Sequence, residues 1–575
     1  MNTEIRIEQK MREDVEIIMA DGTVLCGPRY TPVGAFMRKY QQPDHPLIVG
    51  AIVNNELREL TYPISADANV TPVDMTDSDG ARIYRRSLTF LLEVAFIELF
   101  PDWRLTIDHS VSSGAYYCHV PEQEPFKQEF LDALSEKMQA LVEEDAPLMK
   151  EKVSLAEAKA FFSKHGQDDK LRLLNYRLGD DLVLYSLHDK RDYHHGYMVP
   201  STGYLRWFDL QLVDLGFVIR FPRRHAPNEL LPLTSYPQLL AAFRQYGGWL
   251  KTLGIQSVGA LNDAIKDGRI NEVILVSEAL HTQQISRIAN DIRKRKDEIH
   301  VILIAGPSSS GKTTFSKRLM IQLLTEGLSP FALEMDNYFV DRVDTPLNEE
   351  GEYDFEHLDA VNRELLNDHI TRLIAGERVQ LRQYNFKQGL NEPGEEVQLD
   401  PGQIIILEGI HGLNPKLLEN FPTEQSYRVY VSCLTQLNLD RHNRISTTDT
   451  RELRRILRDA RDRGYTAQQT INHWEMVRRG EKNHIFPYQE NADIMFNSAL
   501  AYELTALKPL VEPLLRQVPY GSHEYIEAKR LLKFLQWFLP IEPHMIPDDS
   551  ILREFIGDSI LTDFKVWQNA NPYDY

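Results

Sequence analysis

Residues 306–313, Gly-Pro-Ser-Ser-Ser-Gly-Lys-Thr, combine the residue types that can hold a polyphosphate. The two glycines let the backbone wrap closely enough for successive N–H groups to point at an anion. Lys312 can reach the β- and γ-phosphates of a nucleotide, and the Thr313 hydroxyl can ligate Mg²⁺. The alternative is a glycine turn that binds nothing. The G-x-x-x-x-G-K-[ST] spacing is met without a mismatch and favours a phosphate site built from Gly306, Pro307, Ser308, Ser309, Ser310, Gly311, Lys312, Thr313 and Thr314.

Two carboxylates follow predicted strands of the same region. Residues 330–335 read as a strand that ends at Asp336, and residues 404–407 as a strand that ends at Glu408. The carboxyl ends of parallel strands face the ligand crevice of an open α/β sheet. Asp336 can accept a hydroxyl proton or bind Mg²⁺ through water, and Glu408 can support the metal. The alternatives are an N-cap or turn aspartate and a turn glutamate without ligand contact.

Four arginines lie at helical spacing further along the chain. Positions i, i+3, i+4 and i+7 share one helix face, here occupied by Arg451, Arg454, Arg455 and Arg458. Such a face can close over a nucleotide and neutralise charge on the phosphoryl group in transfer. The alternative is a solvated face paired with Glu452, Asp459 and Asp462. Together with the phosphate loop, the first interpretation is favoured.

These residues need a sheet to position them. Residues 301–305 are apolar and β-branched, as in a buried strand, and residues 315–324 continue after the glycine loop at helical spacing. Strand, loop and helix in this order are the context that the motif requires. We therefore expect an α/β domain around this loop.

The composition limits the class of protein. The 575 residues are 42% hydrophobic and 26% charged, typical of a soluble globular protein of about three or four domains. The net charge of −20 disfavours a protein that coats nucleic acid. The first 14 residues lack the apolar core of a signal peptide, and no run is long enough to span a membrane. Three widely spaced cysteines make no metal motif. We expect a cytoplasmic protein without a membrane partner.

The region from the phosphate loop onward resembles the uridine kinase/phosphoribulokinase family of P-loop kinases. The matching stretches follow in the family's order: 306–314, 336–339, 353–359, 384–386, 407–410, 451–464, Pro487 and 491–494. The resemblance implies a doubly wound parallel sheet flanked by helices. It implies ATP and Mg²⁺ as cofactors, with Lys312, Asp336, Arg458 and Arg463 as catalytic residues. It also implies a metal site at Thr313 and Glu408, and acceptor contacts from Asp336, Tyr338, Glu356, Tyr384, Phe386, Glu408 and Arg455.

The acceptor pocket departs from the family. Uridine kinases hold ribose with an aspartate where this chain has Glu356, and read the base with a histidine where it has Gly389. An arginine and a glutamine of that pocket fall on Tyr465 and His473. Since a missing buried partner can change discrimination by orders of magnitude, the acceptor is not fixed by the resemblance.

The first 240 residues resemble the TGS and second, editing-type domains of threonyl-tRNA synthetases. Two hairpin signals around a short helix predict a β-grasp domain. The metal-type side chains of the synthetase editing pattern fall on Arg86, Phe90, His194 and Met198, so only His194 survives. We interpret this domain as a scaffold that has lost the editing site, and expect His194 and His195 to be exposed loop histidines.

We therefore expect a multidomain α/β and α+β protein. Its parts are a TGS-like domain over 1–65, the editing-type domain over 66–240, a linker and helices over 241–299, the kinase-like domain over 300–500 and a helical extension over 501–575. A linker is expected at 246–248. The favoured function is phosphoryl transfer from ATP to a small-molecule hydroxyl, most simply that of a nucleoside. The alternatives are another acceptor such as a sugar phosphate, or an ATP-gated regulator associated with RNA, which the acidity disfavours. An oligomer is compatible with the sequence.

Overall fold

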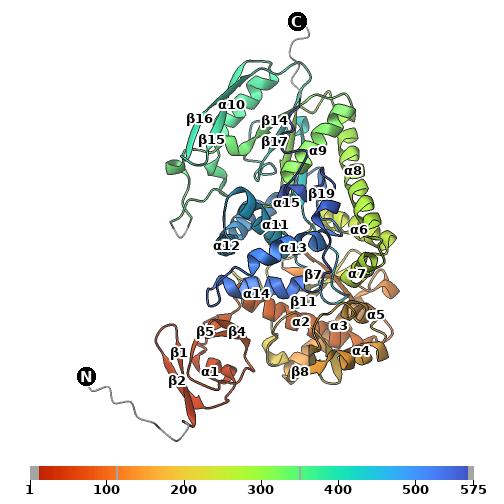
Figure 1. The fold of residues 1–575 in the computed structure, drawn as a ribbon, viewed down its shortest axis with the longest axis vertical. Coiled ribbons are helices and arrows are strands. Elements are labelled where there is room, and N and C mark those ends of the chain that lie inside the picture. The colour runs from red at the N-terminus through yellow and green to blue at the C-terminus, as the bar shows by residue number, and fades with distance from the viewer. Residues whose placement is uncertain (1–11, 112–113, 349–350, 567–575) are drawn as a thin grey trace, which may run out of the picture. The chain divides into compact units, whose positions relative to one another are not determined.

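A computed structural model describes residues 12–111, 114–348 and 351–566 (Figure 1). The chain divides into two compact units, and each is discontinuous in sequence. Unit 1 comprises residues 1–234, 438–444 and 519–530, and unit 2 comprises residues 235–437, 445–518 and 531–575. Across the described ranges, every helix is too short or too polar to cross a membrane.

Unit 2 is built on a five-stranded parallel sheet, as predicted. The strand order is β14 (Pro330–Glu334), β17 (Ile404–Glu408), β13 (Val301–Ala305), β18 (Ser426–Ser432) and β19 (Ile494–Asn497). All five residues of β13 are buried. A parallel sheet is covered by helices on both faces, so neither face of its central strand is exposed to solvent.

The phosphate loop lies at the centre of this sheet. It joins β13 to α9 (Lys312–Thr325), and β13 pairs with β17 on one side and β18 on the other. Parallel pairing aligns Glu334 of β14 with Glu408, the last residue of β17, so the two strands end at the same edge, and Asp336 comes just after β14. The order of the strands therefore places the phosphate loop, Asp336 and Glu408 at the same edge of the sheet.

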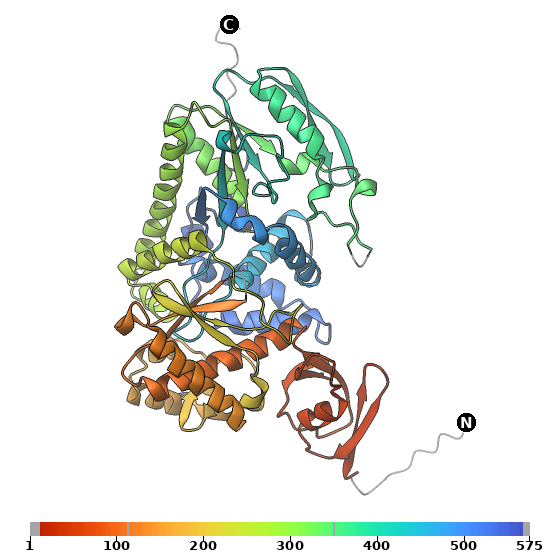
Figure 2. The ribbon, with the colours of Figure 1, turned by 180° about the vertical axis from the view of Figure 1, so that it is seen from behind.

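Further elements of unit 2 surround the sheet (Figures 1 and 2). A hairpin, β15 (Val379–Asn385) and β16 (Leu390–Val397), follows α10 (Arg363–Ile374). The other helices are α6 (Pro237–Leu253), α7 (Val258–Lys266), α8 (Ile270–Lys294), α11 (Thr447–Asp462), α12 (Ala467–His484), α13 (Glu503–Leu515) and α15 (Arg553–Ile556), and α14 (Glu524–Leu535) begins in unit 1.

The linker expected at 246–248 is wrong, because these residues lie inside α6. A side chain at Gly247 would meet the Gln436 amide at 2.6 Å from its Cβ. The glycine therefore serves close packing rather than flexibility, and this gain outweighs its low helix propensity.

Unit 1 begins with a five-stranded sheet of order β2-β1-β5-β3-β4, the red ribbon in Figure 2. The predicted hairpins are β1 (Asp14–Met19) with β2 (Val24–Pro28) and β3 (Ile48–Val53) with β4 (Glu56–Glu59), and α1 (Val33–Tyr40) lies between them in sequence. The central strand β5 (Ala68–Asp74) pairs with β1 and β3, so the sheet extends past residue 65.

The rest of unit 1 packs helices against two antiparallel sheets. The helices are α2 (Ser78–Leu99), α3 (Gln128–Glu144), α4 (Leu155–Lys164) and α5 (Asp168–Leu174). One sheet contains β6 (Thr106–Val111), β7 (Ala115–His119), β11 (Asp209–Val213) and β12 (Gly216–Arg220), and the other β8 (Met149–Ser154), β9 (Asp181–Leu187) and β10 (Lys190–Asp192). Leu131, Leu134, Met138 and Leu141, spaced by three and four residues, form the buried apolar stripe of α3.

Candidate active site

The phosphate loop is shaped around Gly311 and Lys312. Gly311 has φ of +86°, which a glycine adopts without strain, and it precedes the first turn of α9. The Lys312 ammonium donates to the Pro307 carbonyl at 3.2 Å, so the lysine spans its own loop. The first N–H groups of α9 have no partner within the helix, and the dipole makes this end attractive to anions.

The predicted metal-site residues are in contact. The Thr313 hydroxyl donates to Glu408 Oε1 at 3.0 Å. Desolvation raises the pKa of Glu408 to about 7, while Lys312 opposes the rise and Glu554 adds to it. The pKa of Asp336 is also raised, mainly by desolvation and against the effect of Lys312, although its side chain still reaches solvent. Lys312, Asp336 and Glu408 therefore form one electrostatically coupled group.

Glu356, which is predicted to contact the acceptor, interacts electrostatically with Lys312 and Asp336. Its Oε2 is buried and has no hydrogen-bond partner among the described residues. Desolvation and the charge of Glu481 raise the pKa of Glu356 to about 7, and Arg455 acts in the opposite direction. Gly480 of α12 makes the approach possible, since its Cβ would lie 2.5 Å from the Glu356 Cβ. An unpartnered buried carboxylate oxygen is suited to a hydroxyl donor.

Two of the four helix arginines, Arg451 and Arg454, contact backbone carbonyls of the phosphate loop. Arg451 pairs with Glu481 and donates from Nε to the Ser308 carbonyl at 2.9 Å. Arg454, which is fully buried, pairs with Glu503 at 2.8 Å. The alternative of a solvated face is therefore wrong for this part of α11, and these two guanidinium groups shape the loop.

The other two helix arginines, Arg455 and Arg458, lie with Arg463 around one buried carboxylate, Asp459. Its oxygens lie 3.2 Å from Arg455 Nε, 3.2 Å from Arg458 Nη2 and 3.4 Å from Arg463 Nη1. Arg455 also donates to the Ser308 hydroxyl at 2.7 Å. Desolvation lowers the pKa of Arg455, with Asp459 opposing. Arg455 thus connects this arginine cluster to the phosphate loop.

The aromatic residues of the predicted acceptor pocket divide into two groups. Tyr384 and Phe386, on β15 and the turn after it, pack edge to face with centroids 4.9 Å apart, and Phe386 is 58% exposed. Tyr338 does not reach the site: it is fully buried, and its hydroxyl lies 3.0 Å from His369 Nδ1 in the core. Gly389 has φ of +73°, and its Cβ would lie 2.8 Å from the Arg342 side chain, which leaves no room for a histidine.

Two residues at the loop have no signal in the sequence motifs. Glu481 of α12 accepts from the Ser308 N–H at 2.9 Å, and Glu554 of α15 accepts from the Thr314 N–H at 3.0 Å. Glu481 follows Ser308 by 173 residues, and Glu554 follows Thr314 by 240 residues. No rule of sequence spacing connects residues so far apart.

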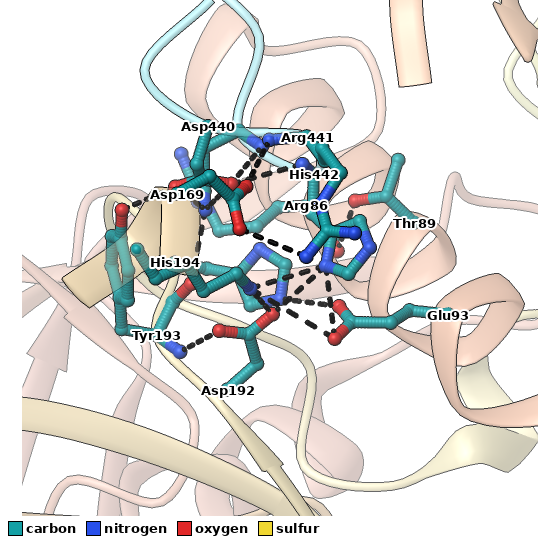
Figure 3. Close-up of polar contacts among 12 residues, drawn as sticks. Arg86, Thr89, Glu93, Asp169, Asp192, Tyr193, His194, Asp440, Arg441 and His442 are labelled. Carbon is teal, nitrogen blue, oxygen red and sulfur yellow. Dashed lines mark hydrogen bonds and ion pairs between the residues drawn. The ribbon is translucent and has the colours of Figure 1, made fainter. Parts of the chain in front are cut away.

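A buried polar cluster occupies unit 1 near the positions of the synthetase pattern. Glu93 of α2, Asp192 of β10 and His194 converge on His442 of the 438–444 segment (Figure 3). His442 Nδ1 lies 3.0 Å from Glu93 Oε1 and 3.2 Å from Asp192 Oδ2, and His194 Nε2 lies 3.6 Å from Glu93 Oε2. The Lys170 ammonium pairs with Asp192 and lies 3.1 Å from His442 Nδ1.

The prediction that His194 is an exposed loop residue is wrong. Its side chain is buried and packs on Phe90, with ring centroids 5.3 Å apart. Glu93, Asp192 and His194 have the spacing of metal ligands, but Lys170 already places a cation against Asp192. Burial would raise the pKa of Glu93, but His442 and Lys170 hold it well below its usual value. An ammonium thus supplies the charge that a metal ion would bring.

Comparison with known proteins supports both family resemblances seen in the sequence. Residues 301–504 match the model of the phosphoribulokinase/uridine kinase family. The N-terminal region is 34% identical over 166 residues to the threonine–tRNA ligase of Burkholderia lata and 35% over 162 residues to that of Acidithiobacillus ferrooxidans. These matches cover 29% and 28% of this chain and 26% and 25% of the ligases. The chain therefore spans about a quarter of the length of these curated relatives.

Two solved structures are similar to part of the chain. A protein described as a possible uridine kinase from Bacillus stearothermophilus is 20% identical, covering 36% of this chain and 100% of that one, with a TM-score of 0.24. D-glycerate 3-kinase from Cryptococcus neoformans is 15% identical, covering 47% and 89%, with a TM-score of 0.20. TM-scores this low add nothing to the family match. On that match, residues 301–504 are a domain of the phosphoribulokinase/uridine kinase family.

Proposed function

We propose that unit 2 transfers the γ-phosphate of ATP to a hydroxyl of a small molecule, most simply a nucleoside. One observation carries the proposal: the phosphate loop, Asp336 and Glu408 meet at one sheet edge, with Lys312 coupled to both carboxylates. Glu408 alone would serve the metal of a bound nucleotide, whereas a second carboxylate, Asp336, suits a base for an acceptor hydroxyl.

The residues also fit a magnesium ion. Thr313 and Glu408 offer oxygen atoms 3.0 Å apart, and Mg²⁺ prefers oxygen ligands. When bound, Mg²⁺ would neutralise charge on the β- and γ-phosphates. Lys312 would hold the same phosphates, Arg458 and Arg463 would approach the transferred group, and Asp336 would orient the acceptor hydroxyl and take its proton.

The acceptor side supports a compound with several hydroxyls. Glu356 offers an unpartnered oxygen, Arg455 lies within its electrostatic range, and Tyr384 with Phe386 provides an aromatic wall. A ribose fits these donors and acceptors, and an aromatic base suits the wall. Because no histidine can stand at Gly389, base discrimination would differ from that of uridine kinases.

The test is acceptor-dependent ADP release across a panel of nucleosides and sugar phosphates, with wild type and Lys312→Ala side by side. Release that requires one acceptor and disappears in Lys312→Ala supports the proposal. A nucleoside acceptor is expected to be preferred over sugar phosphates, and the reverse preference would assign the alternative acceptor class. No acceptor-dependent release from the whole panel would reject the transfer reaction.

The similarity to threonine–tRNA ligases supports one other candidate, an ATP-gated regulator that binds tRNA-like RNA. In that case ATP turnover would respond to tRNA rather than to a small acceptor. Turnover measured with and without unfractionated tRNA separates the two, and stimulation by tRNA alone would favour the regulator.

A further inference from the structure

The segment over residues 550–562 lies against the phosphate loop. Ile551 Cγ2 lies 2.5 Å from the position that a Cβ on Gly311 would take, so the segment is packed directly on the loop. Glu554, in α15, accepts a hydrogen bond at Oε2 from the Thr314 N–H at 3.0 Å. A carboxylate of the chain itself is thus bound where the motif offers donors to phosphate.

The backbone of this segment is held firmly. Lys317 of α9 donates to the Leu561 and Thr562 carbonyls at 2.7 and 2.8 Å, and Arg461 of α11 donates to the Glu554 carbonyl at 3.0 Å. Ile551, Leu552 and Phe555 are buried. The Glu554 side chain is only partly buried, so it can turn away while the backbone stays in place.

Thr314 is the third residue of α9, a helix of 14 residues. The N–H groups of such a first turn have no partner within the helix, and the dipole favours a negative charge there. A phosphate and the Glu554 carboxylate cannot both accept this hydrogen bond, and their like charges repel. Glu554 also lies within electrostatic range of Glu408, whose pKa it helps to raise.

We propose that Glu554 is an internal competitor for nucleotide phosphate: its carboxylate holds the Thr314 N–H until a phosphate group displaces it. The proposal rests on the proposed function, since it takes a nucleotide as the ligand. Its consequence is regulatory, because the protein binds nucleotide more weakly than the loop alone would, and binding frees the Glu554 side chain.

The experiment compares wild type, Glu554→Ala and Glu554→Gln by calorimetric titration with ATP, ADP, tripolyphosphate and adenosine. Asp549→Asn, an exposed acid of the preceding turn, is the matched control. We expect Glu554→Ala to bind ATP, ADP and tripolyphosphate about tenfold more tightly, the scale of one charge-assisted hydrogen bond, and adenosine unchanged. Glu554→Gln, which keeps an uncharged acceptor, should lie between wild type and Glu554→Ala.

Circular dichroism and thermal unfolding check that each variant is folded, and the near-isosteric Glu554→Gln covers a failure of Glu554→Ala. Unchanged or weaker tripolyphosphate binding in both variants overturns the competition. If wild type binds ATP but the variants bind it no more tightly, the competition falls and the proposed function stands. If no protein binds ATP while the variants bind tripolyphosphate more tightly, the competition stands and the proposed function falls. No binding of either ligand rejects both.

Discussion

Lys312 is the side chain on which nucleotide turnover depends most directly. It is half-buried, and within the described part of the chain its ammonium donates to the Pro307 carbonyl of its own loop, so the core does not rely on it. Lys312→Ala is expected to abolish ATP turnover and leave the fold intact, because the phosphate charge loses its partner. Turnover and circular dichroism of Lys312→Ala and of Lys296→Ala, an exposed lysine, provide the comparison. Full turnover in a folded Lys312→Ala protein would remove Lys312 from the mechanism.

Substitution of Asp336 tests whether the site transfers a phosphoryl group or only binds ATP. Asp336→Asn keeps the size and much of the hydrogen bonding of the side chain but removes the base. We expect ATP binding to persist and acceptor phosphorylation to fall by at least ~10²-fold, the lower end for general-base catalysis. ATP affinity and product formation are measured on the same preparations. If both fall together, Asp336 holds the metal instead, and if product formation is unaffected the base assignment fails.

The raised pKa of Glu408 predicts that the stability of the protein depends on pH. The Glu408 pKa of about 7 in the folded protein exceeds the ordinary value of 4.5, so the folded state holds an extra proton between these values. Stability is therefore lost as the pH rises through this window, and the whole cost is present above pH 7. Glu408→Gln removes the cost, and its melting temperature should exceed that of wild type by more at pH 8 than at pH 5. The exposed Glu419→Gln serves as control, and a gain independent of pH would contradict the assignment.

Single residues were predictable where a motif fixes both type and position. The glycine loop, Asp336 and Glu408 follow from the motif and from strand ends, and the structure brings them together. Tyr338 matches the same family stretch, yet its ring packs in the core, because a motif does not state which way a side chain points. Glu554 reaches Thr314 through tertiary packing alone, and no local pattern encodes that.

At the scale of elements, periodicity identified the strands and helices that are regular in sequence. Strand β13 and helix α9 are such cases. Strand β5 was missed although it is central to its sheet: Pro72 interrupts its pattern, and no short turn links it to a neighbour as in a hairpin. Gly247 was misjudged as a linker because close packing against Gln436 is a tertiary effect.

The elements around Lys170 make a testable unit. Lys170 of α5 is fully buried and pairs with Asp192 of β10, while Glu93 of α2 lies 4.0 Å away. Lys170→Met removes the ammonium and leaves the buried Asp192 and Glu93 with His442 as their remaining partner. We expect the free energy of unfolding to fall by about 3–5 kcal/mol, as for a broken buried ion pair. Urea unfolding is compared with that of Lys164→Met, an exposed neighbour, and equal stability of both variants would contradict the role of Lys170.

At the scale of the whole chain, the structure departs from a linear series of domains. Segment 438–444 comes after β18 and before α11 in sequence, yet it belongs to unit 1. Asp440 organises it by accepting from the His442 and Asn443 N–H groups and from the Tyr193 hydroxyl. Domain boundaries read from composition cannot detect such an insertion, because seven residues leave no compositional shift.

This insertion bears on what the synthetase-like region can do. Within unit 1, Lys170 pairs with Asp192, and His442 Nδ1 lies 3.0 Å from Glu93 Oε1, whereas Glu93 Oε2 and His194 Nε2 have no hydrogen-bond partner among the described residues. A hydrolytic site must bind a substrate ester and activate a water molecule, and the side chains at the positions of the synthetase pattern are changed here. Phe90 and Met198, both buried, offer neither an acid–base group nor a metal ligand.

We therefore expect the full chain to hydrolyse no mischarged seryl-tRNA and to contain no stoichiometric zinc. Deacylation is measured with radiolabelled seryl-tRNA(Thr), with the threonine–tRNA ligase of Burkholderia lata assayed in parallel, and metal content is measured after dialysis against a weak chelator. Lys170→Met sharpens the metal test, because it removes the cation and keeps the candidate ligands Glu93, Asp192 and His194. If the ammonium stands in for a metal, this variant, provided that it folds, should take up zinc more readily than wild type. Zinc in wild type at one ion per chain, or deacylation above the uncatalysed rate, would overturn the interpretation of this region as a scaffold.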